Sequence, residues 1–176
     1  MNFRPRLTPG GPGRLREDGG VPTPPQTPDR GRWFTFREDW TLPVAPEAVL
    51  DRLVDLAAYP TWWRQVRSVE QLSSDRARVR ARSLLPVPLD LVLVREHEDR
   101  QVGRLRVGIE GDLQGYVEVH VAPAPGGCRM VWEQRVLLAK PGVRHLAALP
   151  PARWALRANH ALMMRSARAG LARPAG

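Results

Sequence analysis

Cysteine is almost absent from this sequence, since Cys128 is the only one among 176 residues. A single cysteine excludes an intrachain disulfide and a cysteine-based metal cluster, so we expect Cys128 to be structural. No run of about 18 apolar residues occurs, and the stretch from 84 to 94 is broken by Pro86, Pro88 and Asp90. The N-terminus has no apolar signal core. We therefore expect a cytoplasmic protein without a membrane span.

Motifs for metal, phosphate and nucleotide chemistry are also missing. The four histidines, His97, His120, His145 and His160, have no metal-ligand spacing. No nucleophile elbow, phosphate loop or dinucleotide fingerprint occurs. The sequence therefore predicts no metal and no cofactor.

Lysine is nearly absent too, because Lys140 is the only one, and the net charge of +9 comes almost entirely from arginine. Residues 1–32 hold six arginines and three acids, giving +3, and residues 143–176 hold six arginines and no acid, giving +6. Residues 33–142 hold fifteen basic and fifteen acidic residues and are neutral. Because the excess lies only at the two ends, no nucleic-acid partner is expected. Weak association of the basic end with an anionic membrane surface stays open.

Proline, glycine and arginine dominate residues 1–31, which carry few large apolar side chains. Such a segment cannot bury enough surface to offset the entropy of ordering, so it is predicted to be a disordered N-terminal arm. Residues 32–172 are predicted to form one ligand-binding domain, and residues 173–176 a flexible tail.

The remaining pattern predicts a strand, a helix, about six strands and a long final helix. Residues 33–42 alternate, with Phe34, Phe36, Glu38, Trp40 and Leu42 on the face expected to point inward. Pro46 opens a helix that is expected to end by Ala58, because Pro60 disfavours a helical Tyr59. The later strands are expected at 64–72, 76–85, 89–98, 102–110, 113–121 and 128–139, and the last helix at 152–172. Its inward face is expected to carry Trp154, Ala155, Ala158, Ala161, Leu162, Ser166 and Ala169.

Arginines alternate along residues 76–82, and acids and arginines occupy the strands predicted beside them. Opposite charges on adjacent strands stabilise a sheet by about 0.2–1 kcal/mol per pair. We therefore interpret the outer face as internally compensated rather than as a phosphate-binding stripe.

An antiparallel sheet must pack its last helix on one face, and a curved sheet leaves a cavity beneath that helix. Five stretches carry a resemblance to a known family: residues 45–49 (APEAV), Asp55 followed by 59–63 (YPTWW), 85–86 (LP), 111–115 (GDLQG) and 159–163 (NHALM). Over residues 33–172 the chain resembles the START-like, or SRPBCC, superfamily of polyketide cyclase/dehydrase-like, Bet v 1-like and lipid-transfer proteins. The last stretch resembles actinobacterial members.

The resemblance implies an α+β helix-grip fold. In this fold a curved antiparallel sheet of about six to seven strands wraps around a long C-terminal helix, with short helices after the first strand. It also implies a hydrophobic ligand as a class.

Side chains expected inside that cavity suit an apolar ligand with a few polar contacts. The predicted ligand-binding residues are Phe36, Trp40, Trp63, Leu93, Leu113, Trp132, Gln134, Asn159 and Met163. If the protein is instead an enzyme of the polyketide cyclase or dehydratase type, the candidate catalytic residues are Glu38, His97 and Asn159. Peripheral membrane or partner binding through the basic last helix is a further alternative. The ligand and the oligomeric state stay open.

Overall fold

A computed structural model describes residues 33–82, 88–142, 144–145 and 149–173. Its strands are β1 (Trp33–Leu42), β2 (Val66–Gln71), β3 (Arg76–Ala81), β4 (Leu89–Asp99), β5 (Arg104–Gly111), β6 (Leu113–Ala124) and β7 (Gly127–Leu138). Its helices are α1 (Pro46–Val54), the 3-10 helix η1 (Leu56–Ala58), α2 (Tyr59–Trp62) and α3 (Pro150–Leu171). The predicted arm at 1–31, the end of the predicted strand at 76–85 and the Leu85-Pro86 pair lie outside the described residues. So does all of the predicted tail except Arg173.

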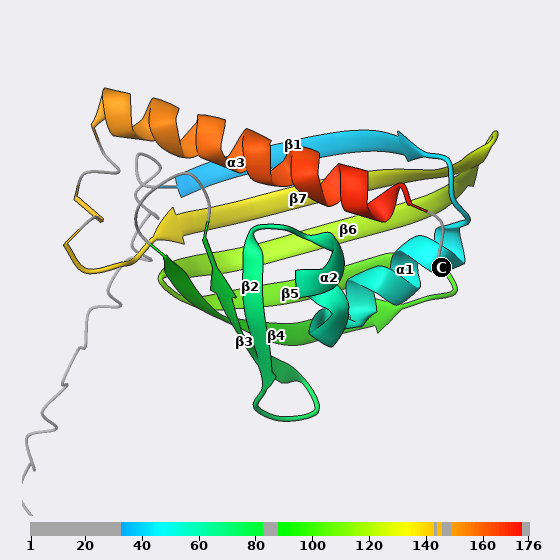
Figure 1. Ribbon diagram of the computed structural model, residues 1–176, viewed down its shortest axis with the longest axis horizontal. Coiled ribbons are helices and arrows are strands. Elements are labelled where there is room, and N and C mark those ends of the chain that lie inside the picture. The colour runs from blue at the N-terminus through cyan, green and yellow to red at the C-terminus, as the bar shows by residue number, and fades with distance from the viewer. Residues whose placement is uncertain (1–32, 83–87, 143, 146–148, 174–176) are drawn as a thin grey trace, which may run out of the picture.

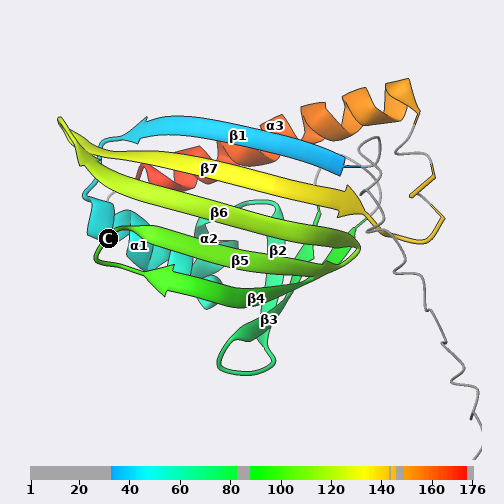
Figure 2. The same ribbon diagram turned by 180° about the vertical axis from the view of Figure 1, so that it is seen from behind.

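The seven strands form one antiparallel sheet in the order β1-β7-β6-β5-β4-β3-β2. The sheet is strongly curved, and α3 lies across its concave side beside α1 and α2 (Figure 1). Seen from behind, the outer face of the sheet is covered by none of the described helices (Figure 2). This is the helix-grip fold that the sequence predicts, with its element order confirmed.

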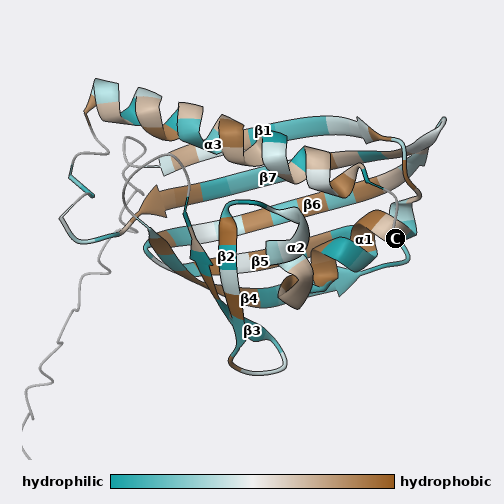
Figure 3. Ribbon diagram, viewed as in Figure 1, coloured by the Kyte–Doolittle hydropathy of each residue, from teal (hydrophilic) through white to brown (hydrophobic). Residues whose placement is uncertain are grey.

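Alternation along the strands creates the two faces, and apolar and polar residues follow one another along single strands (Figure 3). In β1, Phe34, Trp40 and Leu42 are buried, and the residues between them are exposed or partly exposed. The inward face predicted for this strand is therefore confirmed. On the outer face, Arg78 pairs with Glu70 at 2.9 Å and Arg80 with Asp90 at 2.9 Å.

The compensated outer face is confirmed by further pairs of opposite charge. Arg104 pairs with Glu118 at 3.2 Å, and Arg106 lies 2.7 Å from Glu96. Arg76 reaches across β4 to Glu110 at 2.5 Å. These exposed pairs contribute little each, but they neutralise one another across four neighbouring strands.

The helical segment after β1 departs from the prediction. Helix α1 already ends at Val54, because Asp55 leaves the helical conformation and its carboxylate accepts from the Ala58 backbone N–H at 3.2 Å. The helix that Pro46 opens therefore ends before Ala58, as predicted. The expectation that Pro60 keeps Tyr59 out of the helical conformation is wrong, because Tyr59 is helical and begins α2. Pro60 is tolerated because it lies in the first turn of α2, where its missing N–H has no partner to lose.

The predicted inward face of α3 is also wrong for most of its residues, although Ala155 does border the cavity. Trp154 is 74% exposed and Leu162 is exposed, whereas Met164, Ala167 and Leu171 are buried. The buried residues recur at helical spacing and include Gly170, which marks the face that packs on the sheet and on α2. Alanines had dominated the predicted face, and alanine carries little information on burial because its side chain is small.

No helix in the described part of the chain is long and apolar enough to cross a membrane.

Candidate functional site

A cavity of about 350 Å³ lies between α3 and the concave face of the sheet. This volume is within the range of about 300–1,000 Å³ found for small-molecule sites. Its wall is built from residues of all seven strands and from one side of α3. Because side chains alternate between the two faces of a strand, neighbouring strands supply aliphatic side chains at every second position. The apolar wall includes Val79, Leu91, Leu93, Leu105, Val107, Ile109, Leu113, Val117, Val119, Val136 and Leu156.

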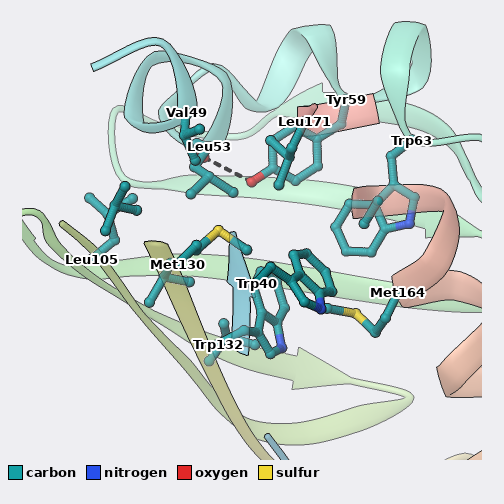
Figure 4. Close-up of a cluster of buried hydrophobic side chains, with 14 of the residues drawn as sticks. Trp40, Val49, Leu53, Tyr59, Trp63, Leu105, Met130, Trp132, Met164 and Leu171 are labelled. Carbon is teal, nitrogen blue, oxygen red and sulfur yellow. Dashed lines mark hydrogen bonds between the residues drawn. The ribbon is translucent and has the colours of Figure 1, made fainter. Parts of the chain in front are cut away.

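Aromatic residues of the α1–α2 segment close one part of this wall. Tyr59 donates its hydroxyl hydrogen to the Leu53 backbone carbonyl at 2.8 Å (Figure 4). Burial raises the pKa of Tyr59, so the phenol stays neutral. Trp63 donates its indole N–H to the Met163 carbonyl of α3 at 3.2 Å. The first bond fixes Tyr59 within the α1–α2 segment, and the second holds this aromatic wall against the last helix.

A small polar cluster, Gln134, Asn159 and His160, interrupts the apolar wall. Gln134 on β7 is 9% exposed, and its Oε1 lies 3.1 Å from Nε2 of His160 and 3.4 Å from Nε1 of Trp132. The His160 ring stacks on Phe36 of β1, with ring centroids 3.6 Å apart. Burial lowers the pKa of His160 from 6.5 to about 4, so the imidazole is neutral at physiological pH.

The side-chain amide of Asn159 makes weaker hydrogen bonds than the side chains of Gln134 and His160. Its Nδ2 contacts the Met163 sulfur at 3.8 Å, and its buried Oδ1 has no hydrogen-bond partner in the described structure. Lys140 is the one charged side chain that the described residues contribute to the cavity wall, and it is neutralised by Asp112, whose Oδ2 lies 2.6 Å from Nζ. The wall therefore offers hydrogen-bonding groups without a net charge.

Most of the predicted ligand-binding residues border the cavity. Phe36, Trp63, Leu93, Leu113, Trp132, Gln134, Asn159 and Met163 all belong to its wall. Trp40 does not border it and is instead buried in the hydrophobic core, at 5% exposure.

Two of the three candidate catalytic residues lie outside the cavity wall. Glu38 is partly buried on β1 and accepts a hydrogen bond from the Trp40 indole at 3.3 Å. His97 is exposed and does not border the cavity, so the structure keeps this candidate catalytic residue away from a bound ligand. The register shifts between Arg95 and His97, and such a bulge turns the following side chains to the other face. Asn159 alone of the three borders the cavity.

His160 borders the cavity, although the sequence patterns did not assign it to the site. Its spacing to Met164, Ala167 and Leu171 is the signal that would have found it, because i, i+4, i+7 and i+11 share one helical face. Among the described residues, no group of three His, Cys, Asp or Glu side chains is placed to hold a metal ion.

Comparison with known proteins gives one family. The model of the family described as "Polyketide cyclase / dehydrase and lipid transport" matches residues 34–173. No curated protein sequence matches the chain.

Several solved structures share the fold at low sequence identity. The Zhui aromatase/cyclase of Streptomyces sp. R1128 has a TM-score of 0.65 and 16% identity, over 79% of this chain and 92% of its own. TTHA0849 of Thermus thermophilus has a TM-score of 0.64 and 19% identity, over 78% and 97%. A START superfamily protein of Mycobacterium smegmatis has a TM-score of 0.60 and 12% identity, over 78% and 94%.

Proposed function

Because this chain belongs to the polyketide cyclase/dehydrase and lipid transport family, we propose that it binds one largely apolar small molecule between α3 and the sheet. The observation that carries the proposal is the cavity itself, whose wall is aliphatic and aromatic apart from Lys140 and the polar cluster. A ligand that buries about 300 Å² of apolar surface gains roughly 7 kcal/mol before the costs of association. Binding of this size needs no metal or charged anchor. The cytoplasmic location expected from the sequence is part of the same proposal.

Titration with the uncharged fluorescent probe N-phenyl-1-naphthylamine tests this function. The wild-type chain should bind one probe with increased emission. Ala155→Trp should weaken binding at least about tenfold, because Ala155 borders the cavity and the larger ring fills it. Ala161→Trp is the matched control, since Ala161 is exposed on the same helix and should leave binding unchanged. Equal effects of the two substitutions, or no binding, would refute the proposal.

A cyclase or dehydratase is the second candidate function, and His160 is the residue that favours it. Such chemistry needs a group inside the cavity that exchanges protons. Glu38 and His97 do not border the cavity, and the amide of Asn159 does not titrate. A neutral imidazole that borders the cavity is the remaining base for removing a proton next to a ketone. Dehydration of a β-hydroxyketone by the wild-type chain, lost in His160→Gln, would support this candidate. Equal rates in the two proteins would remove it.

Association with an anionic membrane is a third candidate, favoured by the exposed start of α3. Trp154 is 74% and Leu149 is 52% exposed, and Arg157 and Arg165 are exposed on the same helix. An indole beside arginines suits the headgroup region of a membrane. Flotation with vesicles containing phosphatidylserine should therefore be reduced by Trp154→Ser. Flotation that is absent, or equal with neutral vesicles, would contradict this role.

A further inference from the structure

We infer that the polar cluster of Gln134, Asn159 and His160 selects apolar ligands that bear one uncharged hydroxyl group, which donates its hydrogen to His160 Nδ1. The inference rests on the proposed ligand-binding function and narrows it to a class of ligand: neutral phenols, enols and alcohols with an apolar body. Three features of the cavity carry it, namely the tautomer of His160, the unpaired amide of Asn159 and the neutralised charge of Lys140.

The tautomer of His160 follows from Trp132. An indole N–H can only donate, so the atom of Gln134 that lies 3.4 Å from it must be the amide oxygen and not the amide nitrogen. The same oxygen lies 3.1 Å from His160 Nε2. Because an oxygen without hydrogen accepts, Nε2 must carry the ring proton. A neutral imidazole has one proton, so Nδ1 carries a lone pair and acts as an acceptor.

Two contacts hold the ring in place, and burial keeps it neutral. Phe36 stacks on one face of the imidazole at 3.6 Å between centroids, and Gln134 holds Nε2. Neither residue is charged, and burial lowers the pKa of His160 to about 4. The described structure shows no protein partner for Nδ1. The acceptor is therefore preorganised for a hydroxyl group on a bound ligand.

Asn159, the neighbour of His160 on α3, is a second polar group without a strong bond. Its Oδ1 is buried and unpaired, and its Nδ2 has only the long contact of 3.8 Å to the Met163 sulfur. An unpaired buried amide is rare, and it has already lost its hydration in the free protein. Rotation of this amide breaks no strong bond, so its oxygen or its N–H can turn to the oxygen-bearing end of a ligand. The ligand then gains a bond that costs the protein no further desolvation.

The neutral cavity wall disfavours ligands that carry a carboxylate. Among the residues that the structure describes, Lys140 is the one cation of the cavity wall, and Asp112 already binds it at 2.6 Å. A ligand carboxylate would lose its hydration and meet no free counter-charge, which is costly in an apolar site. The Tyr59 hydroxyl is occupied by the Leu53 carbonyl, and the rest of the wall is apolar, so one hydroxyl group is all that the described wall accommodates.

Three probes of similar shape test the inference at pH 7.5: 2-naphthol, 2-methylnaphthalene and 2-naphthoate. Wild-type protein should bind 2-naphthol about five- to tenfold more tightly than 2-methylnaphthalene, which is the net effect of one good hydrogen bond. Binding of 2-naphthoate should be the weakest. His160→Phe removes the acceptor and keeps a ring against Phe36. The variant should therefore bind 2-naphthol and 2-methylnaphthalene with about equal affinity. His120→Phe is the matched control, because His120 is exposed on β6, and it should keep the preference.

The outcomes separate this inference from the proposed function. If neither neutral probe binds, the proposed function fails and the inference fails with it. If both neutral probes bind equally, or if 2-naphthoate binds best, binding stands and the inference is overturned. A preference that survives in His160→Phe also overturns it.

An NMR measurement on the wild-type chain keeps the test independent of how the variant folds. Long-range ¹H–¹⁵N spectra of the His160 ring should show a protonated Nε2 and a bare Nδ1. The Nδ1 resonance should shift on addition of 2-naphthol and stay in place with 2-methylnaphthalene. A protonated Nδ1 in the free protein, or equal shifts with both probes, would contradict the assignment.

Discussion

Gly170, in the last turn of α3, packs directly on Trp62 at the end of α2. A Cβ atom at Gly170 would lie 2.3 Å from the Trp62 carbonyl oxygen and 2.9 Å from its ring carbon Cε3. Glycine is needed here because of this close approach and not because of its backbone angles. The contact brings α3 against the short helix that precedes Trp63, whose side chain borders the cavity. The last helix and the α1–α2 segment are therefore one packing unit.

The effect of Gly170→Ala on the free energy of unfolding is informative, because two physical effects predict opposite signs for it. Helix propensity alone predicts that alanine stabilises by about 1 kcal/mol. The close contact with a backbone oxygen predicts instead a loss of about 1–3 kcal/mol in the free energy of unfolding, because backbone cannot move aside cheaply. We expect the loss, measured by urea denaturation. Ala169→Ser, which adds one atom at an exposed neighbouring position, should change stability by less than about 0.5 kcal/mol.

Arg52 of α1 should stabilise the end of α3. Its guanidinium donates to the carbonyl oxygens of Gly170 at 2.9 Å, Leu171 at 3.2 Å and Arg173 at 2.5 Å. Final carbonyls of a helix have no partner within the helix, and a cation there also meets the negative end of the helix dipole. Arg52→Met keeps much of the apolar stem, and we expect it to lower the free energy of unfolding by about 1–2 kcal/mol. The same change at exposed Arg64 should have no measurable effect, and equal effects would contradict this role.

The buried imidazole of His160 predicts a specific pH dependence of stability. Its folded pKa of about 4 lies below the ordinary value of 6.5, so between these values the unfolded chain binds a proton that the folded chain does not. Stability from this group is complete above pH 6.5, falls as the pH drops toward about 4, and changes no further below that. The full difference is about 3 kcal/mol. Unfolding curves of wild type and His160→Phe, compared at several pH values, should diverge over this window.

Other groups should not produce that divergence. Asp39 and Asp90 have pKa values lowered chiefly by hydrogen bonds from Arg129 and Arg80, so their contribution is lost below their ordinary value of 3.8. Both proteins in the comparison retain these aspartates. Parallel curves between pH 6.5 and 4 would show that His160 is not buried as described.

Cys128 should react with thiol reagents only when the chain unfolds. Its side chain is fully buried, and burial raises its pKa, which disfavours the reactive thiolate. We expect labelling by 5,5′-dithiobis(2-nitrobenzoate) to be slow in buffer and fast in denaturant. In an Ala161→Cys variant the exposed new thiol should react at once, leaving Cys128 as the slow site. Rapid labelling of wild-type protein under native conditions would contradict the packing of β7.

Local patterns predicted much of this fold. Alternation in β1 and in the later strands gives the correct faces, because a strand has an unambiguous period of two. Pro46 marks the first residue of α1, where proline is favoured. The resemblance to START-like proteins then supplied the curvature of the sheet and the cavity beneath α3, which no local pattern contains.

Three departures have long-range causes. Trp154 was assigned to the inner face, but α3 is set by the contacts of Gly170 and Leu171 at its far end, which leave the tryptophan exposed. His97 was a candidate catalytic residue, but a bulge turns it away from the cavity. His160 was overlooked because its partners, Phe36 and Gln134, are distant in sequence and meet it only after β1 and β7 have paired.

The location of a bound apolar molecule tests the central claim most directly. Intermolecular nuclear Overhauser effects should be measured between 2-methylnaphthalene and the methyl groups of selectively labelled protein. A ligand between α3 and the sheet predicts contacts to Leu93, Leu113 and Met163, which border the cavity. Contacts confined to the exposed side chains Leu72, Val102 and Leu162 would contradict the account, because they would place the molecule on the surface.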